Sequence, residues 1–214
     1  LSIRIDWILN DIQVPYMMEY LICNNGAIVV TGSIDLTGTK LPELPRFGMR
    51  MELHQPYENL TYYGRGPFEN YIDRYSGAFI GRYEDKVENQ FYWYIRPQET
   101  GNKTDVRWLT LLDSGGLGVK ITGLQPISFS ALHFSPEDLD PGLTRKLQHT
   151  IDIVPQKNIF LHVDLKQRGL GGDNSWGMYP HNEYRLLDKK YTYSYMIELV
   201  EKGSDKNDYL NSRK

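Results

Sequence analysis

The chain has 214 residues and a nearly balanced charge, with 24 Lys and Arg against 27 Asp and Glu. Hydrophobic residues make up 40% and aromatic residues 13% of the chain, which is enough to build a core and excludes an intrinsically disordered protein. No apolar run approaches the roughly 20 residues needed to span a bilayer. The scattered Lys and Arg residues offer nucleic acid no basic patch, so neither a membrane span nor a nucleic-acid partner is expected.

Period-two alternation of apolar and polar side chains dominates the sequence. It is clearest over residues 47–54, where Phe47, Met49 and Met51 alternate with Arg50 and Glu52. The first residues, 1–7, alternate in the same way and lack the order of a signal peptide, so we expect a piece cut from a longer protein. About a dozen strands are predicted. They include residues 3–9, 16–22, 27–34, 47–54, 90–95, 106–112, 117–122, 127–134, 147–153, 159–165 and 191–199.

Turn signals separate these segments, and only one short stretch has a helical pattern. Glycine-containing turns at residues 24–26, 37–39, 113–116 and 202–204 favour hairpins and antiparallel pairing. At residues 135–139, Ser135 is a helix cap and Pro136 the first helical residue. We therefore predict an all-β fold, a large antiparallel β-sandwich formed by one domain over residues 1–200. Residues 201–214 are polar and are expected to form a disordered tail.

Several common kinds of site are excluded by their missing motifs. The five histidines lack metal-ligand spacing, so no metal site or cofactor is expected in this chain. The single cysteine, Cys23, cannot form an intrachain disulfide, and no serine has the setting of a nucleophile. The glycines at 115–118 are not followed by a helix, which favours a hairpin turn over a phosphate-binding loop.

Two polar segments place carboxylates beside glycine and proline. Paired carboxylates can catalyse glycoside hydrolysis, but in a tight turn such groups more often form a buried, hydrogen-bonded corner, with Arg74 here as a forked donor. We favour the structural interpretation. The motif residues are Gly64, Gly66, Pro67, Glu69, Asn70, Tyr71, Asp73 and Arg74 in the first segment, and Glu99, Gly101, Asn102 and Arg107 in the second.

A glycine-rich segment at residues 169–177 presents one large aromatic side chain, Trp176, among small polar residues. A Trp face is a flat apolar platform for the C–H surface of a sugar ring. The neighbouring Asp173, Asn174 and Ser175 offer hydrogen bonds to sugar hydroxyls. A tryptophan folded back onto the core is an equally good interpretation of this segment.

Taken together, residues 64–74, 97–102 and 171–176 resemble, in order and spacing, the C-terminal (small-chain) domain of the large bacterial β-galactosidases of glycoside hydrolase family 2. The resemblance implies a supersandwich related to the galactose mutarotase fold, in which Trp176 stacks on the leaving-group sugar. It also implies that the catalytic glutamates of this retaining enzyme belong to a separate barrel domain, so no catalytic residue lies in this chain.

The same resemblance implies the setting in which the chain works. The partners would be a lactose-like β-galactoside and the other domains of the parent enzyme, and a homo-oligomer of the parent is compatible with the family. Members of the family often need Mg and Na, bound in other domains. The location stays open between the bacterial cytoplasm and the periplasm.

Two other functions remain open on the sequence. A stand-alone enzyme resembling an aldose 1-epimerase would use a histidine acid, from His133, His149 or His162, with Glu183 as the base. A non-catalytic module that binds carbohydrate, or that only contacts other domains, is the third hypothesis.

Overall fold

The computed structural model describes residues 1–140, 142, 148–174 and 176–201. The expected tail at 201–214 therefore lies outside the described residues, apart from Glu201. The described strands are β1 (Ser2–Leu9), β2 (Val14–Ile22), β3 (Ile28–Asp35), β4 (Arg46–Leu53), β5 (Asn59–Gly66), β6 (Phe79–Lys86), β7 (Lys103–Leu112), β8 (Gly118–Leu132), β9 (Ile159–Gln167) and β10 (Lys190–Val200). The short helices are η1 (Val87–Asn89), α1 (Pro136–Leu139), η2 (Thr150–Asp152) and η3 (Asn182–Tyr184). None of these helices has the length and apolar character that crossing a membrane requires.

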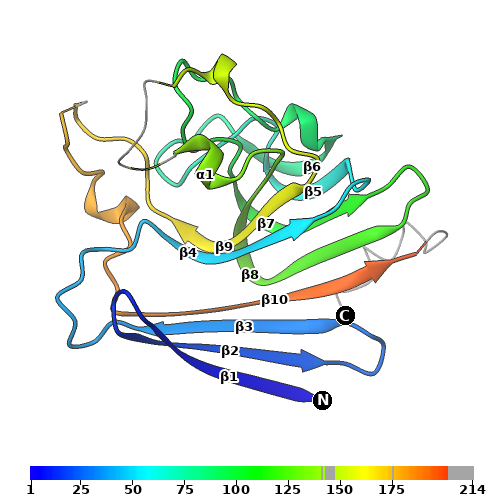
Figure 1. The fold of residues 1–214 in the computed structure, drawn as a ribbon, viewed down its shortest axis with the longest axis horizontal. Helices are drawn as coiled ribbons and strands as arrows, with labels where there is room; N and C mark the ends of the chain where they lie inside the picture. The colour runs from blue at the N-terminus through cyan, green and yellow to red at the C-terminus, as the bar shows by residue number, and fades with distance from the viewer. Residues whose placement is uncertain (141, 143–147, 175, 202–214) are drawn as a thin grey trace.

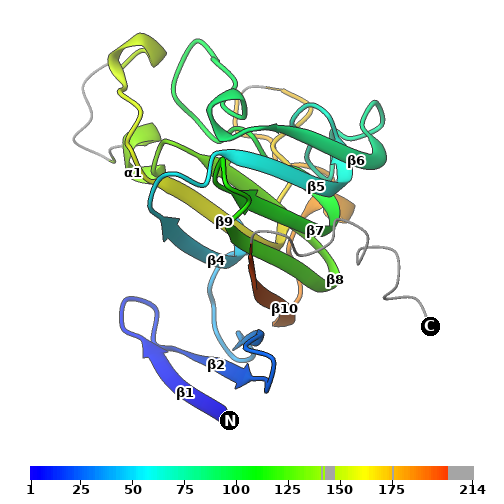
Figure 2. The ribbon, with the colours of Figure 1, turned by 90° about the vertical axis from the view of Figure 1, so that its right-hand side faces the viewer.

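All the strand pairs in the described ranges are antiparallel, and they follow the order β1-β2-β3-β10-β8-β7-β5-β6. The long strand β8 divides this sheet: its first half pairs with β10, whereas residues 128–132 pair with β9, which in turn pairs with β4. The β4–β9 pair therefore lies over the row formed by β3 and β10 (Figure 1). Figure 2 shows β1 and β2 at one end of the molecule and β5 and β6 at the other.

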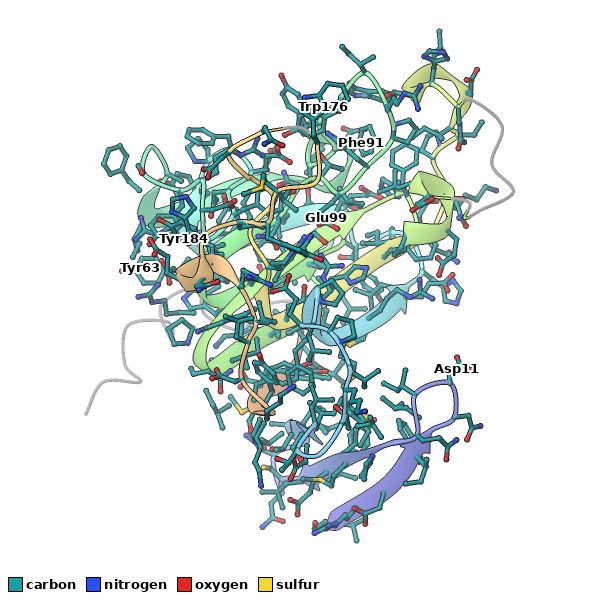
Figure 3. All side chains as sticks on the ribbon, turned by 90° about the vertical axis from the view of Figure 1, so that its left-hand side faces the viewer. Asp11, Tyr63, Phe91, Glu99, Trp176 and Tyr184 are labelled. Carbon is teal, nitrogen blue, oxygen red and sulfur yellow. The ribbon has the colours of Figure 1, made fainter. Side chains whose placement is uncertain are left out.

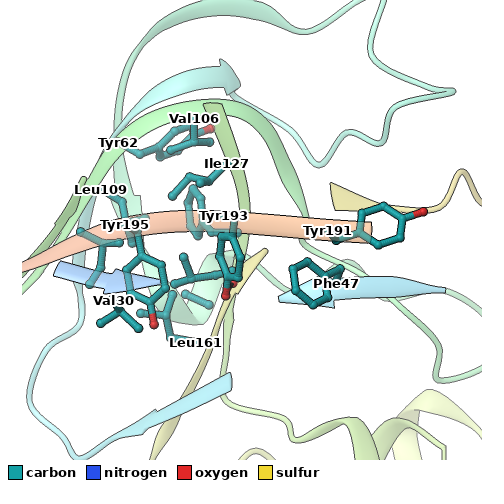
Figure 4. Packing of buried hydrophobic residues seen from close by; sticks show 14 of the residues in the cluster. Val30, Phe47, Tyr62, Val106, Leu109, Ile127, Leu161, Tyr191, Tyr193 and Tyr195 are labelled. Carbon is teal, nitrogen blue, oxygen red and sulfur yellow. Dashed lines mark hydrogen bonds between the residues drawn. The ribbon is translucent and has the colours of Figure 1, made fainter. Parts of the chain in front are cut away.

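Aromatic side chains from β10 and β4 fill the space between the two layers (Figure 4). The Phe47 ring centroid lies 5.6 Å from that of Tyr191 and 5.5 Å from that of Tyr193. The Tyr193 hydroxyl donates to the Val163 carbonyl of β9 at 3.0 Å, so this buried polar group is satisfied. Each such aromatic pair adds about 0.5–1.5 kcal/mol beyond the area it buries. The prediction of an all-β, large antiparallel sandwich is confirmed.

Two of the predicted strands are wrong. Residues 90–95 follow η1 as irregular backbone, with Tyr92 and Trp93 exposed. The Tyr92 backbone N–H donates to the Thr100 hydroxyl and not to a strand. Their aromatic composition suggested a strand, but no described strand pairs with them through a backbone hydrogen-bond ladder. Residues 147–153 contain η2, because the Asp152 carboxylate accepts from the His149 backbone N–H and closes a helical turn. Leu147 itself lies outside the described residues.

Strands β5 and β6 were not predicted, because glycines interrupt their alternation. Gly64 is required by contact: a Cβ there would lie 2.6 Å from a side-chain carbon of Val106. Residues 117–122 and 127–134, predicted as two strands, belong largely to the single strand β8. The predicted helix is confirmed as α1, where the Ser135 hydroxyl accepts from the Asp138 N–H and the Asp138 carboxylate accepts from the Ser135 N–H.

Candidate functional site

The segment that carries Trp176 leaves β9 and reaches η3 as an open loop. Trp176 is 93% exposed and lies at the end of the molecule opposite Asp11 (Figure 3). The Asn174 side-chain oxygen accepts from the Trp176 backbone N–H at 2.8 Å, which fixes the turn under the indole. Asp173 lies 3.2 Å from His181, and both side chains are exposed. Ser175 lies outside the described residues. The exposed position is the one required of a platform, and it differs from a tryptophan packed on the core.

Asp73 connects the glycine–proline corner to the start of the Trp176 loop. Its Oδ2 accepts from the Gly171 N–H at 2.7 Å, and its other oxygen is buried without a hydrogen-bond partner in the described structure. A Cβ on Gly169 would lie 2.6 Å from the Asp73 carboxyl carbon. The glycines are therefore needed here for close approach as well as for flexibility. Two motifs that are about 100 residues apart in the sequence form one unit.

A buried carboxylate holds the two ends of this loop. Glu43, whose side chain is 6% exposed, accepts from Arg168 at 3.0 Å and from Arg185 at 2.5 Å. Burial alone would raise the pKa of Glu43, but the two guanidinium groups hold it below its ordinary value. The Tyr179 ring lies against both guanidinium groups, at 4.6 Å from Arg185 and 5.7 Å from Arg168. The base of the loop is thus fixed on both sides of the exposed indole.

The corner itself is a hydrogen-bonded structure centred on Glu69. This carboxylate accepts from the Gly101 N–H at 2.8 Å, from the Thr100 hydroxyl at 3.1 Å and from Arg74 at 2.7 Å, and also from the Tyr94 hydroxyl. Gly101 has φ +77°, a conformation that favours glycine. Arg74 donates through one nitrogen, Nη2, and its side chain is 56% exposed. The expectation of a buried guanidinium that donates through two nitrogens is therefore wrong.

The remaining motif residues support the same corner. Asn70 is fully buried: its amide donates to the Arg65 carbonyl, its oxygen accepts from the Thr104 N–H, and its backbone exchanges hydrogen bonds with Asn102. Burial raises the pKa of the Tyr71 hydroxyl well above its ordinary value. The other members lie in β5, in β7 or just after β5. Gly64 and Gly66 lie against Val106 and Tyr62, the Pro67 carbonyl accepts from Tyr62, and Arg107 donates to the Asp105 carbonyl.

Glu99 does not belong to the Glu69 corner but to a second cluster, organised by Arg46 at the start of β4. The Arg46 guanidinium contacts His162 Nδ1 at 3.0 Å, Glu99 at 3.0 Å, Gln167 at 2.7 Å and the fully buried Asp164 at 3.0 Å. Burial, with the nearby arginines, lowers the pKa of His162 to about 4. Burial also raises the pKa of Asp164 to about 7, although Arg46 opposes the rise.

The histidines and Glu183 proposed for an epimerase are not joined by any interaction among the described residues. His133 pairs with Glu58 at 3.1 Å, His162 pairs with Arg46, and Glu183 lies in η3 beside Tyr184. Within the described ranges, no group of three or more His, Cys, Asp or Glu side chains is arranged to hold a metal ion. Trp176 and its loop are therefore the leading candidate site.

Comparison with known proteins places this geometry in a family. The family described as "Beta galactosidase small chain" matches residues 4–197. The chain belongs to this β-galactosidase small-chain family. It is 34% identical over 197 residues to a protein named Beta-galactosidase from Priestia megaterium, and 35% identical over 190 residues to one from Streptococcus thermophilus. These matches cover 92% and 88% of this chain but only 18% of each relative, so the chain spans less than a fifth of their length.

Three residues that hold the Trp176 loop were missed by the sequence analysis. Glu43, Arg168 and Arg185 are far apart in the sequence, and no local pattern pairs an acid near residue 40 with arginines on either side of a glycine-rich loop. The only available signal was that two arginines flank the loop that carries Trp176. That signal does not identify the acid, because the acid comes from the strand-poor segment before β4.

Proposed function

We propose that the chain is the small-chain domain of a β-galactosidase, a retaining enzyme that hydrolyses terminal β-D-galactosides, and that Trp176 is the platform for the leaving-group sugar. The catalytic glutamates, and any Mg or Na, belong to other parts of the parent. The proposed partners are a lactose-like galactoside, the parent's other domains and, in a homo-oligomer of the parent, its further copies. The observation that carries the proposal is the 93% exposure of an indole on a loop fixed at its base.

An exposed indole on an anchored loop is suited to stacking against a sugar. Leaving a large aromatic side chain in water forgoes about 1.5–3 kcal/mol of burial, so a partner that covers it is favoured. The anchors made by Asp73 and Glu43 restrict the loop before a ligand arrives, which lowers the entropy lost on binding. Asp173 and Asn174 precede Trp176 in the same loop and supply acceptors and a donor for hydroxyl groups.

The test is Trp176→Ala in the full-length parent, with inhibition constants measured for glucose and for galactose. Glucose binding at the leaving-group position should weaken by about 1–3 kcal/mol, while galactose binding should hardly change. Trp93→Ala is the matched control, because Trp93 is also exposed, at 61%, but lies outside this loop. Equal losses for both sugars, or the same loss from Trp93→Ala, would contradict the platform role.

Asp73 serves in this proposal as a positioning residue for the loop. Asp73→Ala removes the acceptor for Gly171 N–H, and the parent should then lose about 1–2 kcal/mol of glucose binding. Asp73→Asn keeps an oxygen at the same place and should restore most of that loss. If Ala and Asn variants behave alike, or if galactose binding falls as much as glucose binding, Asp73 has no positioning role.

A further inference from the structure

A cavity of about 490 Å³ opens beside the Arg46 cluster. Its walls come from the start of β4, from β8 and β9, from residues 96–100 and from α1. No described residue of the Trp176 loop lines it. Because the proposed function does not use this cavity, its polar groups need a separate explanation.

The hydrogen bonds of His162 fix which of its nitrogens faces the cavity as a donor. A guanidinium only donates, so His162 Nδ1, 3.0 Å from Arg46 Nη1, must be the acceptor. The pKa of His162, lowered to about 4 by burial, keeps the ring neutral at pH 7. Its proton is then on Nε2, for which the described residues supply no acceptor, and the His162 side chain is half-buried and lines the cavity. His162 therefore offers one fixed N–H donor to the cavity.

Glu99 offers the matching acceptor. A carboxylate has about four lone-pair positions, and Arg46 and Gln167 use two of those on Glu99. The Glu99 side chain is 31% exposed, in the cavity that it lines. Since Arg46 holds His162 through Nη1 and Glu99 through Nη2, one rigid guanidinium sets the spacing between donor and acceptor.

The described residues that line the cavity carry no net formal charge. Two are positive, Arg46 and Arg96, and two are negative, Glu99 and Asp140, so this lining gives no net attraction for a ligand of either sign. The remaining wall is mixed. Ser130 adds a hydroxyl, and the apolar part is formed by Leu132, Phe134 and Leu139. Fixed polar groups on an apolar wall are typical of sites for small molecules, and a donor and an acceptor at a fixed spacing suit a ligand with several hydroxyls.

We propose that this cavity binds a neutral monosaccharide, with one sugar hydroxyl accepting from His162 Nε2–H and another donating to Glu99. The site is distinct from the Trp176 platform, and it is a binding site without a covalent step. A free monosaccharide held by a few hydrogen bonds is expected to bind with a millimolar dissociation constant.

The test is a titration of the isotopically labelled 214-residue chain with D-galactose and D-glucose, following the ring nitrogens of His162 by NMR. Either sugar should shift the His162 Nε2–H resonance, and His162→Gln identifies that signal by removing it. Glu99→Gln keeps an oxygen for Arg46 but replaces acceptor capacity by a donor, and it should weaken sugar binding about tenfold. Glu137→Gln is the matched control, because Glu137 is an exposed carboxylate that pairs with Arg50 outside the cavity, and it should leave binding unchanged.

Three results would overturn the proposal. The first is no change at His162 with about 100 mM of either sugar. The second is equal weakening by Glu99→Gln and Glu137→Gln. The third is tighter binding of galactonate or galactosamine, which would make the site one for charged ligands. Trp176→Ala separates the two sites: it should leave the His162 response intact even if the platform proposal fails.

Discussion

The buried Asp164 and the half-buried His162 of the Arg46 cluster should give the protein opposite pH dependences that cancel in the wild type. His162 has its pKa lowered from 6.5 to about 4, and Asp164 has its pKa raised from 3.8 to about 7. Between pH 4 and 6.5 the folded chain therefore holds a proton on Asp164, whereas the unfolded chain holds one on His162. The number of bound protons is the same in both states, so these two groups contribute almost no slope to the free energy of unfolding in that range.

Removing either group should reveal how the other makes the free energy of unfolding depend on pH. Stability rises with pH wherever the unfolded state binds more protons, by at most about 1.4 kcal/mol per pH unit for one proton. In Asp164→Asn only His162 remains, so the free energy of unfolding should rise from pH 4 to 6.5, by about 3 kcal/mol in total. In His162→Gln only Asp164 remains, so stability should fall as pH rises from about 4 to 7.

Urea unfolding at half-unit pH steps measures both slopes, and subtracting the wild-type curve removes the contribution of all other carboxylates. The expected result is two difference curves of opposite sign. Parallel curves, or two flat ones, would show that these groups are not buried in the protonation states inferred from their contacts. That result would also remove the support for a neutral His162 ring in the cavity beside the Arg46 cluster.

Two further predictions concern packing and burial elsewhere. Gly48→Ala places a Cβ 1.9 Å from Asp164 Oδ1 and should lower the free energy of unfolding by about 1–3 kcal/mol. Gly77→Ala, where the nearest contact of the Cβ is 3.4 Å, should lower it far less. Equal losses would be inconsistent with a tight approach of β4 to β9. Burial lowers the pKa of Lys103 to about 8 from its ordinary 10.5. In urea unfolding, the wild type should therefore gain stability relative to Lys103→Met as the pH rises from 8 to 10.5. A stability difference that stays constant with pH would contradict the burial of Lys103.

The strand pattern could be predicted where one face of a strand packs on the core and the other faces solvent, as in β4. It could not be predicted where close packing requires glycine, as at Gly64 in β5, because glycine carries no periodic signal. The aromatic segment around Trp93 misled the prediction for a related reason. Aromatic side chains favour strands on average, but a strand needs hydrogen-bonding neighbours that the local sequence does not specify.

The candidate sites differ in the same way. Trp176 was recognisable because glycines and small polar residues on both sides of it mark a loop. The Arg46 cluster was not recognisable, because Arg46, Glu99 and His162 come from three distant segments. Arg46 and His162 meet through the register of β4 against β9, including its irregularity between Phe47 and Gly48, and Glu99 reaches them from the irregular segment before β7. Register is a tertiary property, and a one-residue slip would turn these side chains to the other face.

Hydrolysis of nitrophenyl β-D-galactoside, measured for the 214-residue chain alone and for the full-length parent, tests the proposed division of labour most directly. We expect hydrolysis by the parent and none by the chain alone, because the catalytic glutamates of a retaining glycosidase are proposed to lie outside it. Hydrolysis by the purified chain alone, or a parent without galactosidase activity, would contradict the assignment of this chain as a β-galactosidase domain that contributes a sugar platform.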